Sequence, residues 1–238
     1  MEATYQYGSA PTRNPFRWLL AAWRVSKDLS NTGEAAIVEI GFSRSWIGRK
    51  FAGWERTVEL LSENESTLAA LRTRRRLGPI NIDLLANEPE KSLGRVFAGH
   101  CRQKGIDPNL VSISVENDND FVMAHLFETH DIWHVVTGWG NDELGEVGLG
   151  GFLLAQLKLP LIGLMLALIL LNTVFVKPSS MGDRMDALLA GYQMGKKAKP
   201  LFGVNWEANW GRSVDEIRLE LGLLDNVVLG EGVVRPAS

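Results

Sequence analysis

The chain has 238 residues, 45% of them hydrophobic, so it is long enough to bury a sizeable core without disulfides. Its 25 basic and 28 acidic side chains leave a net charge of −3, which argues against nucleic acid as a partner. The single cysteine, Cys101, excludes an intrachain disulfide and favours a reducing compartment, with Cys101 as a small core residue.

The N-terminal segment lacks the features of a secretion signal. Residues Met1 to Gly8 are mostly polar, and the first apolar stretch, Trp18 to Trp23, is too short and too far along the chain. We therefore expect a cytoplasmic protein. Apolar residues at helical spacing between Phe16 and Trp23 predict the first helix.

Helical periodicity dominates the rest of the chain. It recurs between Leu93 and His100 and again between Met185 and Tyr192, whereas Ala36 to Ile40 and Leu110 to Val115 are only weakly strand-like. No long linker separates the helical segments. The sequence therefore predicts an all-α fold in a single domain over residues 1–238, with 225–238 as a loose tail.

Serines mark the starts of the last two helices. Ser180 with Asp183, and Ser213 with Glu216, each have the spacing of a helix-capping pair. Gly222 is then a natural helix end.

The strongest basic run is Arg72, Arg74, Arg75 and Arg76. It is either a solvated helix C-terminus, where cations meet the negative end of the dipole, or a site for an anion such as a prenyl phosphate or an acidic membrane surface. Lys196, Lys197 and Lys199 form a second basic patch with the same alternatives.

Three of the four histidines fall between positions 125 and 134. On a helix, His130 and His134 project from one face about one turn apart, which is the spacing of two metal ligands. Asp131 is close enough in direction to bind the same ion or to orient a histidine.

Glu146 completes the pattern if the chain reverses direction. An unbroken helix would place Glu146 about 18 Å from His134, too far for a shared ion. Gly138, Gly140 and Asn141 suit a helix end and turn, and Asp142 suits the cap of a new helix. The sequence therefore predicts a divalent metal site on a helix-turn-helix, with His130, Asp131, His134 and Glu146 as ligands. Two imidazoles with carboxylates suit zinc best, and iron, manganese or magnesium stay open.

The segment from Leu159 to Val176 is strongly apolar. Its uninterrupted apolar run is shorter than the ~20 residues that a bilayer needs, so a buried helix is favoured over a membrane span. A third alternative is a helix that lines a pocket for a prenyl chain or dips into a membrane interface. In that case Leu164, Leu168 and Leu171 would contact the lipid. Trp133 would then form an aromatic wall for a quinone ring, although packing is its simpler role.

These motifs resemble the family of coenzyme Q (ubiquinone) biosynthesis protein 4. The pattern is His-Asp-x-x-His, eleven residues, then Glu, and residues 135 to 145 supply the eleven. The similarity continues through Gly191-Tyr-Gln-Met-Gly, Ala198-Lys-Pro-Leu and Trp206-Glu-Ala-Asn-Trp to the segment 214–221. It covers residues 90–224 clearly and the first 90 loosely.

The resemblance implies a mostly helical protein that binds a divalent metal at the four predicted ligands, together with an isoprenoid lipid. Two roles come with it: oxidative decarboxylation at ring carbon one of a polyprenylated hydroxybenzoate, or a non-catalytic scaffold that organises other quinone-biosynthesis proteins. Because the chain lacks an amphipathic, arginine-rich leader, a bacterial origin is favoured, with the protein in the cytoplasm or peripheral on the inner face of the cell membrane.

A metal-dependent hydrolase is the third alternative and the weakest, because Asp131 occupies the place where the zincin pattern has a glutamate. Self-association into a homo-oligomer is also expected.

Overall fold

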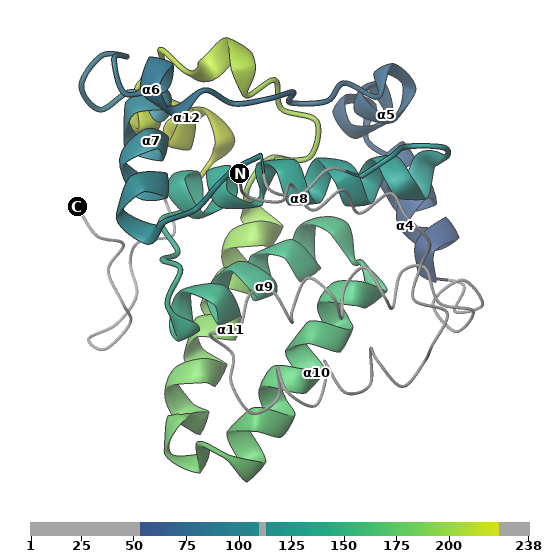
Figure 1. Ribbon diagram of the computed structural model, residues 1–238. Coiled ribbons are helices and arrows are strands. Elements are labelled where there is room, and N and C mark those ends of the chain that lie inside the picture. Colours follow the sequence, from purple (N-terminus) through teal and green to yellow (C-terminus); the bar gives the residue numbers. More distant parts are fainter. Residues whose placement is uncertain (1–52, 110–112, 224–238) are drawn as a thin grey trace.

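The computed structural model describes residues 53–109 and 113–223, and in this part of the chain the regular elements are helices (Figure 1). The predicted all-α class is therefore confirmed. The α-helices of these residues are α4 (Gly53–Ser62), α5 (Glu65–Thr73), α6 (Ile82–Leu85), α7 (Leu93–Lys104), α8 (Asp118–Thr137), α9 (Glu143–Leu157), α10 (Pro160–Phe175), α11 (Met181–Lys197) and α12 (Val214–Leu221), with 3₁₀ turns η1 (Pro178–Ser180) and η2 (Glu207–Asn209).

Some predicted features lie outside the described residues: the first helix at 16–23, the strand-like segment 36–40 and the tail 225–238. The single domain over 1–238 therefore stays a prediction. The second strand-like segment is described only from Ile113 to Val115, and these residues form no strand. The helices predicted around Leu93 to His100 and Met185 to Tyr192 are confirmed as parts of α7 and α11.

The central helix is α8, which crosses the molecule in Figure 1 and contacts α4, α5, α7, α9 and α12. Most of its residues are buried, including Phe121, Ile132 and Trp133. A helix enclosed on several sides holds its polar side chains in fixed surroundings, and α8 carries His125, His130 and His134.

Glycines allow α9 and α11 to pack backbone against backbone. A methyl group at Gly191 of α11 would overlap the carbonyl oxygen of Gly148 on α9, and one at Gly195 would lie 2.6 Å from the Phe152 carbonyl oxygen. The Gly191-x-x-x-Gly195 pattern quoted in the sequence thus has a packing cause.

Backbone hydrogen bonds join the starts of α7 and α12. Leu93 N–H donates to the Arg212 carbonyl oxygen, and Val214 N–H donates to that of Lys91. From α12, the Arg218 guanidinium donates to the carbonyl oxygens of Val135 and Val136 at 2.9 Å each. A cation thus satisfies carbonyl groups at the C-terminal end of α8.

The apolar segment from Leu159 to Val176 forms α10, with Pro160 in its first turn. Among the described residues no helix is long and apolar enough to cross a membrane. The polar pair Asn172 and Thr173 faces the buried Arg184 of α11, which bonds Asn172 at 2.8 Å and also pairs with Glu143 of α9. One buried guanidinium therefore links three helices.

Ser180 occupies the N-cap position of α11 as predicted, but its side chain makes no capping hydrogen bond, whereas the cap at Ser213 is confirmed. Ser180 precedes α11, but η1 leads into this helix, and the Ser180 hydroxyl donates to the Lys177 carbonyl oxygen instead. Its backbone is not extended, which a capping side chain requires. Ser213 is extended and accepts from Asp215 N–H, and Gly222 ends α12 at φ 70°.

Candidate metal centre

The turn between α8 and α9 reverses the chain as predicted. Gly138 ends α8 at φ 81°, and its N–H donates to the His134 carbonyl oxygen at 2.9 Å. Asp142 then caps α9, because its side chain accepts from Gly145 N–H at 2.8 Å. The capping residues proposed from sequence are therefore confirmed.

Two further glycines let this turn lie directly on α9. A methyl group at Gly145 would overlap the Gly140 carbonyl oxygen, and one at Gly148 would overlap the Trp139 ring. Glu146 lies between these two glycines in the sequence. Close packing of the turn thus brings the first turn of α9 back beside the end of α8.

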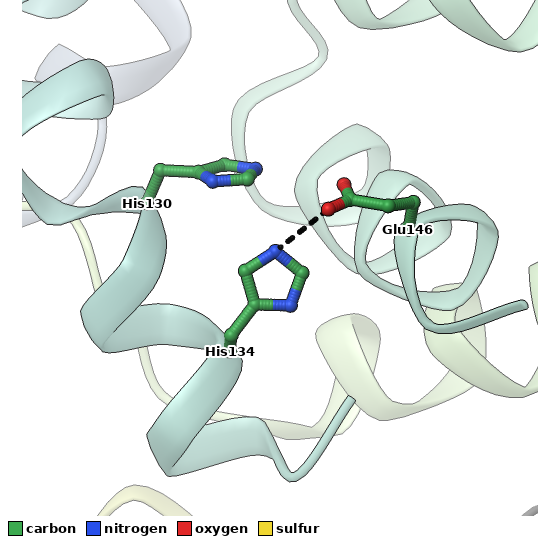
Figure 2. Close-up of side chains that lie close together, drawn as sticks. All are labelled: His130, His134 and Glu146. Carbon is green, nitrogen blue, oxygen red and sulfur yellow. Dashed lines mark ion pairs between the residues drawn. The ribbon is translucent and has the colours of Figure 1, made fainter. Parts of the chain in front are cut away.

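The reversal brings together His130, His134 and Glu146. Each offers one ligand atom, and these atoms lie within 4.8 Å of one another. His134 Nε2 is 3.3 Å from Glu146 Oε1, near the ~3.4 Å expected between two atoms bound tetrahedrally to one ion at about 2.1 Å. Figure 2 shows the His130 ring and the Glu146 carboxylate on either side of the space above His134.

The hydrogen bond of His134 determines which of its nitrogens is available. Its Nδ1 lies 2.9 Å from the Trp139 carbonyl oxygen, which can only accept, so Nδ1 carries a proton. In the neutral ring Nε2 then has a lone pair, and Nε2 is buried with no hydrogen-bond partner among the described residues. Nε2 lies 3.3 Å from the Glu146 carboxylate, and either a proton on Nε2 or a cation between the two groups stabilises this arrangement.

Asp131 lies beside this group rather than in it. Its Oδ1 is 3.8 Å from His130 Nδ1, and its side chain is a quarter exposed. Burial acts to raise the pKa of Asp131, but the neighbouring His130, His134 and His100 outweigh burial and lower it. An ionised Asp131 suits either role predicted for it, as a ligand or as the group that orients His130.

Glu146 is also held in its charged form. Burial would raise the pKa of this carboxyl, as would the charge of Asp131, but His134 and His130 lower it overall. The site therefore presents two carboxylates and two imidazoles, the donor set of a divalent cation such as zinc.

Sequence reasoning missed His100 of α7. Its ring lies 6.3 Å from that of His134 in a stacked arrangement, and its Nε2 is buried without a hydrogen-bond partner among the described residues. Burial lowers the pKa of His100, and the nearby histidines and Lys104 lower it further, whereas the charge of Asp131 acts to raise it. A signal was present, since His100 ends the apolar stripe of its helix.

The predicted lipid contacts have mixed surroundings. Trp133 is fully buried and packs edge-on against Phe152, which supports its packing role. On α10, Leu168 is buried, Leu164 is half-buried and Leu171 is 47% exposed. Contact of these four residues with a lipid stays a prediction.

Comparison with known proteins decides the family. The family model for "Coenzyme Q (ubiquinone) biosynthesis protein Coq4" matches residues 46–226, about three quarters of the chain. The chain belongs to the Coq4 family. The resemblance noted in the sequence is thus confirmed at the level of the family.

Relatives in fungi and a solved structure agree with this assignment. The chain is 32% identical over 160 residues to the mitochondrial ubiquinone biosynthesis protein coq4 of Talaromyces stipitatus, covering 64% of this chain and 54% of the relative. Identity to the Coq4 protein of Komagataella phaffii is 28%, with 60% and 48% covered. The chain thus spans about half the length of the curated relatives it matches.

The fold also matches a crystal structure of a candidate ubiquinone biosynthesis protein from Nostoc punctiforme. The TM-score is 0.74 at 26% identity, and the match covers 89% of this chain and 99% of that one. The helical arrangement described above is therefore shared by a protein of known structure.

Proposed function

We propose that this chain acts in ubiquinone biosynthesis as a protein that binds a divalent metal and a prenylated quinone precursor. Membership of the Coq4 family supports the pathway, because the relatives are named for it. The observation that supports the metal is the buried His134 Nε2, which lies 3.3 Å from Glu146 Oε1 in one group with His130. His130, His134 and Glu146 are the proposed ligands, with Asp131 as a fourth ligand or as the group that orients His130.

The proposed reaction takes place at ring carbon one of a polyprenylated hydroxybenzoate, where a hydroxyl replaces the carboxyl group and carbon dioxide leaves. A bound divalent cation would supply Lewis acidity, accepting charge from the substrate carboxylate or phenolate. The chain's own contribution is orientation. Trp139 holds the His134 ring through Nδ1, and Asp131 lies at ion-pair distance from His130.

This replacement is a two-electron oxidation, so it needs an oxidant besides the side chains of the site. In an aerobic assay dioxygen is the oxidant: with water as the source of the hydroxyl oxygen, dioxygen takes up two electrons and two protons and leaves as hydrogen peroxide. Zinc has no redox chemistry, so turnover with zinc alone requires that dioxygen reacts with the substrate itself, whereas iron or manganese would allow electron transfer. The identity of the metal thus bears directly on the mechanism.

A test of the function starts with the purified full chain. Elemental analysis identifies the metal and mass spectrometry the bound lipid, and a prenylated hydroxybenzoate is then offered in air with each candidate metal. Loss of the carboxyl group with gain of a hydroxyl supports the enzyme. Bound metal and lipid without turnover would instead support the scaffold alternative and contradict the proposed reaction.

The ligand assignment has its own variant. His134→Ala removes a buried donor, so we expect loss of the metal with most of the helical circular dichroism retained. His125→Gln is the matched control, because His125 lies on the same helix outside the ligand group and should keep the metal. Full metal occupancy in His134→Ala would contradict the assignment.

We also propose that the protein works at a membrane surface. The support is a set of exposed apolar side chains at the C-terminal end of α10 and the residues that follow it: Leu170, Leu171, Val174, Phe175, Val176 and Met181. Exposed apolar side chains grouped at one end of a molecule are typical of a surface that contacts lipid or another protein.

A further inference from the structure

The basic run of the sequence borders a cavity. After α5 the chain turns at Arg74, which has φ 46°, and continues into Arg75 and Arg76. Both arginines line a cavity of about 210 Å³ whose wall is formed by α5, α8 and the segment 203–207. The sequence left two alternatives for this basic run, a solvated helix end and an anion site. Because Arg75 lines a cavity, we favour the anion site for this residue.

One wall of this cavity carries a buried histidine whose proton can be placed. His125 is 5% exposed, and its Nε2 accepts a hydrogen bond from Gly203 N–H at 3.1 Å. The proton of the neutral ring must then be on Nδ1. This Nδ1 is buried and has no hydrogen-bond partner among the described residues, so it is an unsatisfied donor.

A second residue of the wall also has a buried donor without a hydrogen-bond partner among the described residues. Trp206 is 1% exposed, and its Nε1, which can only donate, has no hydrogen-bond partner among the described residues. An unsatisfied buried donor costs about 1–3 kcal/mol. An occupant of the cavity with acceptor atoms would satisfy donors of this kind.

The two arginines differ in how far they are already engaged. Arg76 pairs with Glu128 of α8 and also donates to the Ile113 carbonyl oxygen at 3.1 Å. Arg75 is exposed and forms no ion pair with any described residue, so its charge is available. Glu207 is the acidic side chain on the wall, and it is exposed to solvent.

The remaining wall is largely apolar. Ala69, Ala70, Leu77 and Val204 line it beside the Trp206 ring. The cavity therefore suits an anionic oxygen group attached to a small apolar body rather than a bare ion.

We propose that this cavity is a second ligand site, which binds a small organic molecule through a phosphate or carboxylate group held by Arg75 and the N–H groups of His125 and Trp206. It is separate from the metal group, since none of His130, His134 and Glu146 lines it. On α8 the directions of His125 and His130 differ by about 140°, so the two sites use different faces of one helix.

The test observes the cavity wall directly. The full chain is labelled with ¹⁵N, and the Trp206 indole signal is assigned by its loss in Trp206→Phe. Phenyl phosphate, benzoate and inorganic phosphate are titrated at constant ionic strength set with chloride. We expect a saturable shift of the Trp206 signal with an organic probe. Saturation by phenyl phosphate selects the phosphate, saturation by benzoate selects the carboxylate, and no saturation by either probe overturns the proposal.

Variants separate a built site from general charge attraction. Arg75→Gln should weaken binding at least about tenfold, because a charged hydrogen bond is lost. Arg72→Gln is the matched control: it removes the same charge from the same run but lies outside the wall, so it should leave affinity unchanged. Glu207→Gln should strengthen binding. Equal weakening by Arg72→Gln and Arg75→Gln would overturn the site.

Independence from the metal is tested in the same experiment. Binding should persist when the protein is treated with a chelator and in His134→Ala. Loss of binding in both cases would contradict a separate site, whereas failure of the metal proposal would leave the binding intact.

Discussion

Hydrogen-bond partners decide what each buried histidine of α8 offers. His134 donates through Nδ1 to a carbonyl oxygen, which leaves a lone pair on Nε2. His125 accepts at Nε2 from Gly203 N–H, which leaves a proton on Nδ1. One helix therefore carries a histidine of the proposed metal group and a histidine of the proposed anion site, nine residues apart in sequence.

His125 should also make stability depend on pH. Burial, followed by the charge of Arg76, lowers its pKa to about 4, whereas in the unfolded chain His125 takes up this proton near the ordinary histidine pKa of 6.5. Between these values the unfolded state binds more protons, so stability falls as pH falls. We expect the free energy of unfolding to drop about 2 kcal/mol more in the parent than in His125→Gln between pH 7 and pH 4.5.

Urea titrations at the two pH values measure this difference. The lowered pKa values of Asp131, Glu143 and Glu146 also reduce stability at low pH, but they are present in both proteins and cancel in the comparison. Equal losses in the parent and the variant would show that His125 is not the titrating group.

At the scale of elements, the fold depends on glycines where helices and turns meet. Gly145 and Gly148 let the 138–142 turn lie on α9, while Gly191 and Gly195 let α11 approach α9. The same helix α9 carries Glu146 to the metal group and Glu143 to Arg184. Close packing of α9 thus fixes one ligand of the site.

Gly191→Ala should therefore destabilise the protein. Its methyl group would overlap the Gly148 carbonyl oxygen, and backbone cannot move aside as a side chain can. Overpacking of this kind costs about 1–3 kcal/mol, which chemical denaturation would detect. Gly163→Ala on α10 is the control: no atom lies within 4 Å of the added methyl, so stability should rise by about 0.5–1 kcal/mol. Unchanged stability of Gly191→Ala would contradict the described packing.

The local sequence predicted the helices and the turn of the site, whereas contacts between residues far apart in the sequence could not be predicted from it. The end of α8 at Gly138 and the cap at Asp142 follow from residue types whose preferences act within one turn, so the reversal was predictable. The approach of His100 depends on how α7 packs against α8, and no sequence spacing encodes that. At Ser180 the local sequence had the spacing of a helix-capping pair. The 3₁₀ turn before α11 sets the backbone of Ser180, so its side chain makes no capping hydrogen bond.

At the scale of the whole molecule, the proposed metal group lies where α8 and α9 meet, and the exposed apolar side chains lie at the C-terminal end of α10, beyond Asn172 and Thr173. Figure 1 shows this end of α10 at the bottom of the molecule. Arg184 and Glu143 link this end of α10 to the first turn of α9, which also carries Glu146. Arg184 and Glu143 thus join the proposed contact surface of α10 to the helix that carries a proposed metal ligand.

Contact with a membrane can be tested on that end of α10. Val174 is 54% exposed and Phe175 79%, so insertion into a lipid surface would bury both side chains. Burial of each is worth about 1–3 kcal/mol, so Val174→Ser with Phe175→Ser should lower partition into vesicles at least about tenfold. Co-sedimentation with vesicles of phosphatidylcholine and phosphatidylglycerol measures this.

Leu189→Ser on α11, where the side chain is 59% exposed, is the matched control and should bind like the parent. Because the proposed contact is apolar, binding should persist at high salt. Release by salt with no effect of the double substitution would instead assign the contact to basic side chains and contradict the role of α10.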